Sequence, residues 1–428
     1  MLGHRRAASV GALLAVAACS TPSAMTPTAA PPATPSAAPS TAVVQATAAA
    51  DPLTGMSLRE KVGQLFMPVL YGSRVDTAHQ ENQARYGVAT PAQVIKKYQL
   101  GGMILFPGTG NIVDARQLAR LTAGLRAASP KTPLLIGVDQ ENGLVSRLGD
   151  VITKLPGAKT IGDTGDPDKA RIVARATGEE LRALGISLDF APVADVNVNP
   201  RNPVIGPRAY GARPKLVADM VSAAVKGFHQ SGIAATAKHF PGHGDTATDS
   251  HTALPVIHHT RAQWERLDAP PFRAAIKSGV DAIMSAHIVM PKLDSSGDPA
   301  TLSRKVLTGL LREELGFKGV IITDALNMDG VRKKYGDGEV AVRAVLAGAD
   351  ILLMPPDFPK AYQAVVDAVE SGRISASRLN QSVRRILAMK TKRGLYAKDF
   401  FPDPSKAATL VRTPEHAKVA RAVTADTG

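Results

Sequence analysis

The sequence predicts an α/β protein with a (β/α)8 TIM-like barrel, forming a single domain after a disordered N-terminal tether. The chain has 428 residues, of which 44% are hydrophobic, so there is material for a large core. Aromatic residues make up 4%, which suits an α/β core better than an aromatic-rich sandwich. From about residue 51, eight short apolar runs alternate with helical segments, and eight such units favour a barrel over a doubly wound open sheet.

The elements follow from the pattern in chain order. Ser57-Leu-Arg-Glu60 is a capping box that opens the first helix. The runs after it are almost continuously apolar, as strands covered on both faces must be. The expected strands are Leu65–Leu70, Gly102–Phe106, Leu134–Val138, Ser187–Ala191, Ala234–Lys238, Ala282–Ala286, Val320–Thr323 and Asp350–Met354. Helical periodicity between them predicts helices that include Asp114–Ala127, Lys169–Leu184 and Glu339–Ala347.

The N-terminal segment predicts export and a lipid anchor. A short basic stretch precedes the apolar run from Val10 to Ala18, which is too short to span a bilayer and is typical of a signal peptide. Cys19 follows it in a pattern that resembles a bacterial lipobox, and it is the single cysteine of the chain. We expect a signal peptide over residues 1–18 and, over 19–50, a lipidated Cys19 with a disordered Ala, Pro, Thr and Ser linker. A plain secretory signal is the alternative.

The polar residues collect at one end of the predicted strands. These strand-end side chains are Asp139, Asp189, Asp195, Lys238, His239, His287 and Asp324, whereas the opposite ends mostly begin with Gly or small residues. In a barrel the chemistry lies at the carboxyl ends of the strands, so this asymmetry supports the fold independently of the strand count. The formal net charge of +14 is spread along the chain and predicts a solvated basic surface rather than a nucleic-acid site.

The segment from Lys238 to His251 carries three histidines and two aspartates on a Gly- and Pro-rich loop. His239, His243, Asp245, Asp249 and His251 have the chemistry of metal ligands, but their spacings match no strong zinc signature. We therefore expect no metal and no cofactor. The alternative is general acid–base chemistry, because a carboxylate at Asp249 can orient the imidazole of His251 and raise its pKa. A polar surface loop without a catalytic role also remains open.

Asp324 ends the apolar strand Gly319-Val-Ile-Ile-Thr-Asp324. An aspartate in this position either caps the following loop or serves as an active-site carboxylate. Its place at the polar end of the predicted barrel favours the catalytic role.

Several motifs in this order resemble family 3 glycoside hydrolases, and more narrowly their bacterial β-N-acetylglucosaminidase branch. They are Gly137-Val-Asp139-Gln-Glu, Asn202-Pro-Val-Ile-Gly-Pro-Arg208, Lys238-His-Phe-Pro-Gly-His-Gly-Asp, Asp249-Ser-His251 and Ile322-Thr-Asp324-Ala-Leu-Asn-Met. The resemblance covers about residues 53–395, so a barrel domain is expected over 51–400. It leaves 401–428 as a C-terminal extension that resembles the lead-in to a second domain of longer relatives.

The resemblance implies a retaining mechanism on terminal β-linked N-acetylglucosamine. Asp324 would be the nucleophile, and His251 paired with Asp249 would be the acid/base. The sugar-binding residues implied by the motifs are Asp139, Arg147, Arg208, Lys238 and His239. The substrate would be a glycan or muropeptide containing N-acetylglucosamine, handled by a monomer at the cell envelope, either held at the outer face of the plasma membrane through Cys19 or secreted.

One departure from the family pattern concerns the turn after Asp139, where the usual Gly is Asn142. Asn tolerates left-handed backbone angles better than most residues, so the turn can be kept. The alternatives left open are a β-glucosidase or a glycoside phosphorylase of the same family, a metal-dependent hydrolase that uses the His-rich loop, and a lipoprotein that binds glycans without turnover.

Overall fold

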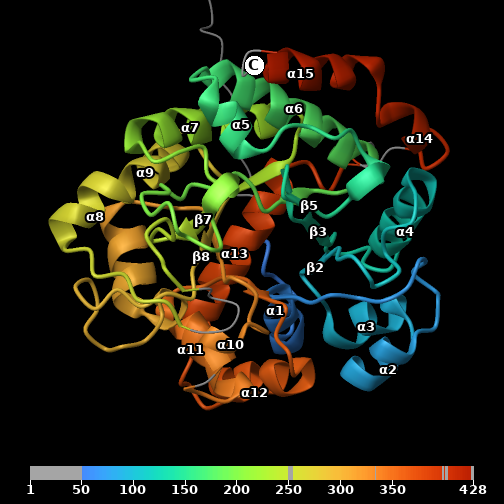
Figure 1. Cartoon of the computed structure of the whole chain (residues 1–428). Helices are drawn as coiled ribbons and strands as arrows, with labels where there is room; N and C mark the ends of the chain where they lie inside the picture. Colours follow the sequence, from blue (N-terminus) through green and yellow to red (C-terminus); the bar gives the residue numbers. More distant parts are fainter. Residues whose placement is uncertain (1–50, 249–253, 333, 398–399, 401–402, 426–428) are drawn as a thin grey trace, which may run out of the picture. The chain divides into compact units, whose positions relative to one another are not determined.

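The computed structural model of the chain describes residues 51–248, 254–332, 334–397, 400 and 403–425 (Figure 1). Three of the residues singled out above, Cys19, Asp249 and His251, lie outside these described residues, as do the expected signal peptide and linker. The part described belongs to one structural unit, which begins at Ala50.

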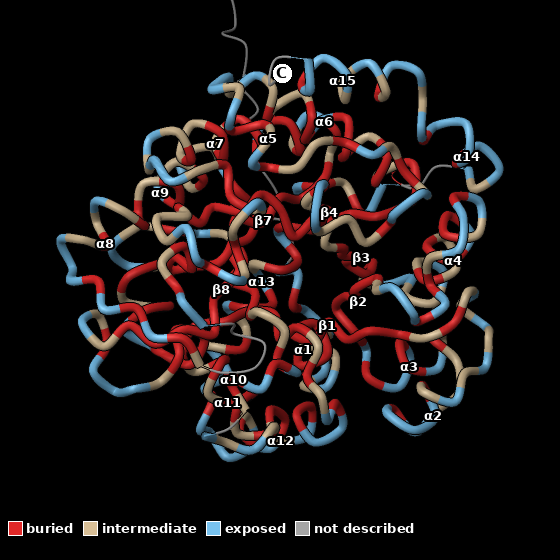
Figure 2. The backbone as a smooth tube through the Cα atoms, in the orientation of Figure 1, coloured by how far each residue is buried: buried red, intermediate tan, exposed pale blue. Residues whose placement is uncertain are grey.

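Eight parallel strands lie where the apolar runs predicted them. They are β1 (Phe66–Met67), β2 (Gly102–Ile104), β3 (Leu135–Val138), β6 (Leu188–Asp189), β7 (Ala234–Phe240), β8 (Ala282–Ser285), β9 (Val320–Ile322) and β10 (Leu352–Leu353). Six of them form one parallel sheet in the order β2-β3-β6-β7-β8-β9, and β1 pairs with β10. Every residue of these eight strands is buried, in line with the buried (red) interior in Figure 2. The α/β class and the parallel arrangement are thereby confirmed.

Helices connect the strands and cover them, with exposed residues on their outer turns (Figures 1 and 2). The helices before β7 are α1 (Leu58–Gln64), α2 (Gln80–Tyr86), α3 (Pro91–Tyr98), α4 (Ala115–Ala127), α5 (Ala158–Asp163), α6 (Pro167–Ala183) and α7 (Pro214–Gln230). Those after it are α8 (Arg261–Leu267), α9 (Ala269–Lys277), the π-helix η4 (Lys305–Glu314), α10 (Asp329–Arg332), α11 (Asp337–Ala347), α12 (Phe358–Glu370), α13 (Ala376–Lys392), α14 (Ala407–Leu410) and α15 (Pro414–Thr424). Within the described residues, no helix has both the length and the apolar character needed to cross a bilayer.

Local sequence signals account for the helix starts. The Ser57 hydroxyl accepts from the Glu60 backbone N–H while the Glu60 carboxylate accepts from the Ser57 N–H, so the predicted capping box is confirmed. Asp114 caps α4 in the same way by accepting from the backbone of Gln117. The three predicted helices are present as α4, α6 and α11, with ends that differ by one or two residues.

The turn at Asn142 joins the two strands of a small antiparallel hairpin, β4 (Gln140–Asn142) and β5 (Val145–Ser146). Asn142 has φ 66°, so the left-handed conformation expected for this position is confirmed. Its side chain donates to the Thr177 hydroxyl of α6 at 2.9 Å and accepts from Gln140 at 3.0 Å. The residue that replaces glycine therefore also ties the hairpin to a neighbouring helix.

The C-terminal helix α15 packs against α6. His416 of α15 is buried, with Nδ1 2.6 Å from Glu180 Oε1 and Nε2 3.0 Å from Glu179 Oε2. Glu180 also accepts from the backbone of Arg412 and from Thr153. The described part of the extension, residues 403–425, thus packs on α6 through a buried histidine that lies between two carboxylates.

Candidate active site

A cavity of about 420 Å³ opens at the carboxyl ends of the parallel strands. Strand residues such as Ile104 of β2 and Met284 of β8 form part of its wall, and residues that directly follow strands complete it. The residues predicted as nucleophile or sugar ligands line this one cavity, and they are Asp139, Arg147, Arg208, Lys238, His239 and Asp324. His243, which the sequence offered as a metal ligand, lines it as well. Residues that are as much as 185 positions apart in the chain therefore meet at one place, as the strand-end pattern predicted.

Strand β7 supplies two neighbouring residues to the cavity. Successive strand residues normally point to opposite faces of a sheet. The pairing of β7 with β8 shifts register between Lys238 and Phe240, and this irregularity lets both Lys238 and His239 line the cavity.

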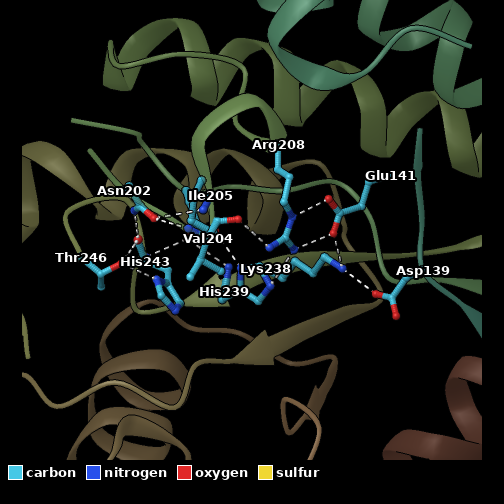
Figure 3. Close-up of polar contacts among 11 residues, drawn as sticks. Asp139, Glu141, Asn202, Val204, Ile205, Arg208, Lys238, His239, His243 and Thr246 are labelled. Atoms are coloured by element: carbon cyan, nitrogen blue, oxygen red, sulfur yellow. Dashed lines mark hydrogen bonds and ion pairs between the residues drawn. The ribbon is translucent and has the colours of Figure 1, made fainter. Parts of the chain in front are cut away.

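A chain of ion pairs runs across the cavity floor (Figure 3). Lys238 Nζ lies 2.7 Å from both Asp139 Oδ1 and Glu141 Oε1. Arg208 donates two parallel hydrogen bonds to Glu141, from Nη2 to Oε1 at 2.7 Å and from Nε to Oε2 at 2.9 Å. Such bidentate, charge-assisted bonds fix the planes of both groups. Glu141 thereby holds the two cations in place from the hairpin strand β4.

Burial and charge act in opposite directions on these groups. Burial raises the pKa of Glu141, but the charges of Lys238 and Arg208 and their hydrogen bonds outweigh it and lower that pKa to about 2. Burial lowers the pKa of Lys238, and the charges of Asp139 and Glu141 more than restore it, so that it lies above its ordinary value. Both groups are therefore charged at neutral pH.

Asp195 organises the two histidines beside this chain of ion pairs. Its Oδ2 lies 2.7 Å from His239 Nδ1, and its Oδ1 accepts from the backbone N–H of His239 and of His243 at 3.2 and 2.8 Å. Arg208 Nη2 lies 3.4 Å from His239 Nε2, which directs that nitrogen toward the cavity cations. Burial lowers the pKa of His243 to about 4, so its ring is neutral at pH 7.

Asp324 lies two residues beyond the end of β9 and its side chain is partly buried. Its Oδ1 accepts from the backbone N–H of Ala325 at 2.7 Å. Burial raises the pKa of Asp324, but the positive charge that His287 and His239 can carry, the Ala325 N–H and Lys238 together bring it below its ordinary value. His287 donates from Nε2 to the Ala325 carbonyl at 3.0 Å, which holds the imidazole against this turn. Asp324 is therefore an ionised carboxylate facing the cavity.

Arg147 differs from the other cations of the cavity because no carboxylate is paired with it in the described residues. Its guanidinium carbon lies 5.1 Å from the ring centre of Phe106, and its buried Nε has no hydrogen-bond partner there. The lining as a whole is balanced between three carboxylates and three permanent cations, which are Asp139, Glu141, Asp324, Arg147, Arg208 and Lys238.

The sequence left open a metal site formed by His239, His243, Asp245, Asp249 and His251. Asp249 and His251 lie outside the described residues. In the structure the His239 and His243 side chains hydrogen-bond to Asp195 and Thr246. Asp245 lies 3.0 Å from a ring nitrogen of His259. Across the part of the chain that the structure describes, no group of three or more His, Cys, Asp or Glu side chains has the arrangement to hold a metal ion.

The comparisons with known proteins agree with this geometry. A model of the glycosyl hydrolase family 3 N-terminal domain matches residues 57–389, which is more than three quarters of the chain. The chain belongs to glycosyl hydrolase family 3. All six predicted cavity residues described above fall within the part that matches.

Two curated relatives and one solved structure extend the match. Beta-hexosaminidase A of Pseudoalteromonas piscicida is 38% identical over 330 residues, which are 70% of this chain and 55% of that protein. A beta-hexosaminidase of Nitrosomonas eutropha is 37% identical over 297 residues, 66% of this chain and 83% of that protein. The structure of a family 3 β-N-acetylglucosaminidase from Paenibacillus sp. str. FPU-7 superposes with a TM-score of 0.81 at 43% identity, covering 87% of this chain and 69% of that one. The chain thus spans about half the length of the Pseudoalteromonas protein.

Two functional residues of this family 3 site were not assigned by sequence reasoning. Glu141 lies in the same motif as Asp139, but its spacing alone does not reveal that it holds both Lys238 and Arg208. Asp195 was recognised only as a polar residue after a strand, and its place between two histidines is visible only in three dimensions. A buried carboxylate in an α/β chain is the signal that points to such roles, because buried charges must be paired.

Proposed function

We propose that the protein hydrolyses terminal β-linked N-acetylglucosamine with retention of configuration. The observation that carries the proposal is Asp324, an ionised carboxylate in a cavity at the carboxyl ends of the strands of a family 3 chain. An ionised aspartate can attack the anomeric carbon and form a covalent glycosyl-enzyme, which water then resolves. The relatives named beta-hexosaminidase and β-N-acetylglucosaminidase support the choice of sugar.

The floor of the cavity is suited to sugar hydroxyls. Asp139 retains acceptor capacity beside Lys238, and the donors of Lys238, Arg208, His239 and Arg147 face the same space. A hydroxyl that donates to Asp139 and accepts from Lys238 would join an ion pair that already exists, so little reorganisation is needed when the sugar enters. We assign these five residues to binding of the terminal sugar.

The acid/base of the proposal is the pair Asp249 and His251, which stays an assignment from the sequence because both residues lie outside the described ones. Support comes from chain geometry. The segment that carries them follows β7, which contains His239, and itself contains His243; both histidines line the cavity with Asp324. A protonated imidazole there would donate to the leaving oxygen and, in the second step, accept a proton from water.

The decisive experiment uses aryl N-acetyl-β-glucosaminide with the purified full chain and its Asp324→Ala variant. Wild type should release the phenol and Asp324→Ala should not, and a fluorinated sugar should label the peptide that contains Asp324 in the wild type. Undiminished turnover in the variant would refute the nucleophile. Equal turnover of the aryl β-glucoside would indicate the β-glucosidase alternative, and sugar 1-phosphate formed in phosphate buffer would indicate a phosphorylase.

We also propose that the eight parallel strands close into a (β/α)8 barrel. Two isolated parallel bridges support closure, Val69 with Ile104 between β1 and β2, and Ile322 with Ile351 between β9 and β10. The amide of Ile104 donates to Pro68 O at 3.0 Å and that of Thr323 to Ile351 O at 3.0 Å. In a closed barrel both amides exchange slowly with solvent deuterium, and rapid exchange of either would contradict closure.

For cellular location we propose a lipid anchor at Cys19 and action on peptidoglycan fragments outside the cytoplasm. The basic stretch, short apolar run and single cysteine of the N-terminus support it. Mass spectrometry of the mature protein should find Cys19 as a lipid-modified N-terminus, and Cys19→Ala should abolish the modification. An unmodified chain cleaved elsewhere would indicate plain secretion.

A further inference from the structure

The segment between β7 and α8 carries the proposed acid/base pair, and its two described flanks are held by different neighbours. The incoming flank, residues 241–246, is bound from one side: Asn202 Nδ2 donates to His243 O at 2.8 Å and Asn199 Nδ2 donates to Thr246 O at 3.2 Å. The outgoing flank, residues 255–259, pairs with the segment after β8, where Ile257 N–H donates to Val289 O at 2.9 Å. Each of these contacts holds one flank to its own neighbour, and none of them joins one flank to the other.

The side chain of His259 joins the two flanks directly. Its Nε2 lies 3.0 Å from Asp245 Oδ2 on the incoming flank, and its Nδ1 lies 2.7 Å from Asp268 Oδ2 at the junction of α8 and α9. The His259 side chain is 8% exposed and that of Asp268 is 1% exposed. One buried imidazole therefore connects the two flanks, which are fourteen positions apart in the chain, to the helix pair behind them.

The residues against which His259 packs are themselves buried and in close contact. Trp264 of α8 donates from its indole to Pro241 O at 2.8 Å, and it is fully buried. A Cβ at Gly242 would come within 2.6 Å of Asp268 Oδ1, so the loop backbone lies directly against this carboxylate. Asp268 is thus packed between the start of the loop and the imidazole.

Protonation of the His259 ring favours its contacts with both carboxylates. The hydrogen bond to Asp268 raises the pKa of His259, burial opposes this, and Asp268 and Asp245 add to the rise through their charges and the second hydrogen bond. A doubly protonated imidazole donates to both carboxylates at once, whereas the neutral ring can donate to only one of them.

We propose that His259 is a positioning residue which, by tying Asp245 to Asp268, fixes the two described flanks of the segment that carries the Asp249–His251 pair and so supports proton transfer to the leaving group. The inference rests on the proposed function, because it gives His259 its effect through the acid/base pair. The chain also offers a matched control. His416 is likewise a buried histidine between two carboxylates, but it joins α15 to α6 and does not line the cavity.

The experiment compares kcat/KM for a phenyl and a dinitrophenyl N-acetyl-β-glucosaminide in the full chain. The phenyl substrate has a poor leaving group and needs protonation, whereas the dinitrophenyl group leaves without it. The variants are His259→Gln, Asp245→Asn, His251→Ala and His416→Gln, with thermal unfolding measured for each. Asp245 is 38% exposed, so Asp245→Asn removes the negative charge from this contact with little disturbance of the core.

If His259 positions the acid/base, His259→Gln and Asp245→Asn lose on the order of ten- to a hundredfold on the phenyl substrate and less than about threefold on the dinitrophenyl one. His251→Ala shows the same selectivity more strongly, and His416→Gln lowers the unfolding temperature without any selectivity. Equal losses on both substrates in His259→Gln and Asp245→Asn, beside a selective His251→Ala, would overturn the positioning role alone. A His251→Ala variant without selectivity would overturn the acid/base assignment and the positioning role with it.

Discussion

The Glu141→Gln substitution tests whether the buried Glu141 carboxylate stabilises the protein as the counter-ion of Lys238 and Arg208. Glu141→Gln keeps the shape of the side chain but leaves Lys238 and Arg208 beside a neutral amide. The folded protein lowers the pKa of Glu141 from 4.5 to about 2, which corresponds to roughly 3 kcal/mol because one pKa unit is about 1.4 kcal/mol. The Glu141 side chain is only 4% exposed, so solvent screens little of this contribution. We expect the variant to lose about 3 kcal/mol of unfolding free energy at neutral pH.

The sign of the pH dependence follows from the direction of the pKa shift. A carboxylate with a depressed folded-state pKa contributes its full stability above its ordinary pKa and loses it as the pH falls toward the folded value. Urea unfolding should therefore show a gap between wild type and Glu141→Gln that is constant near neutrality and narrows below about pH 5.

A surface glutamate provides the matched control for this variant. Glu339 also lies between two arginines, Arg343 and Arg373, but its side chain is 31% exposed. Glu339→Gln should cost less than about 1 kcal/mol. Equal losses in Glu339→Gln and Glu141→Gln, or a gap for Glu141→Gln that does not change with pH, would refute the assignment of Glu141 as the buried counter-ion.

Further substitutions address single contacts. Asp324→Asn should fold normally and lose at least about a thousandfold in kcat on aryl N-acetyl-β-glucosaminide, and a smaller loss would mean that another group attacks the sugar. Asn142→Ala should lower the unfolding free energy by about 2 kcal/mol through backbone strain at φ 66° and loss of the hydrogen bond to Thr177, whereas Asn142→Gly should lose only the second part. Arg208→Lys removes the bidentate contact to Glu141 and should raise KM about tenfold, and an unchanged KM would place the guanidinium outside sugar binding.

The part of the site that could be predicted from the sequence follows from strand periodicity. Asp139, Lys238 and Asp324 each stand at or just beyond the end of an apolar run, and parallel strands bring such ends to one edge. The same pattern located the eight parallel strands, and local chemistry sufficed for the capping box and the left-handed turn. These features depend on neighbours that are close in the chain, so a single sequence contains the information for them.

The remaining contacts depend on pairings between distant segments. Asp195 meets His239 across 44 positions, and Glu141 meets Arg208 across 67. Such a contact requires knowing how a hairpin or a loop folds back over the strand ends, and no local pattern encodes that angle. His259 illustrates the point, since its two carboxylate partners lie on separate segments, and the motif that ends at Asp245 does not reveal its contact with His259.

Ionic strength should affect the short ion pairs inside the cavity differently from the long-range attraction exerted by the net charge of the chain. The contacts within the floor are about 2.7 Å long, far shorter than the screening length of about 8 Å at physiological salt. Added salt therefore leaves them intact, and the KM for a neutral glycoside should stay constant as salt increases. The 51 Lys and Arg residues of the chain outnumber its 37 Asp and Glu residues, which gives a net charge of +14. Any adhesion of this excess charge to an anionic wall polymer should weaken with salt. Salt should therefore weaken any such adhesion without changing the proposed binding of the terminal sugar.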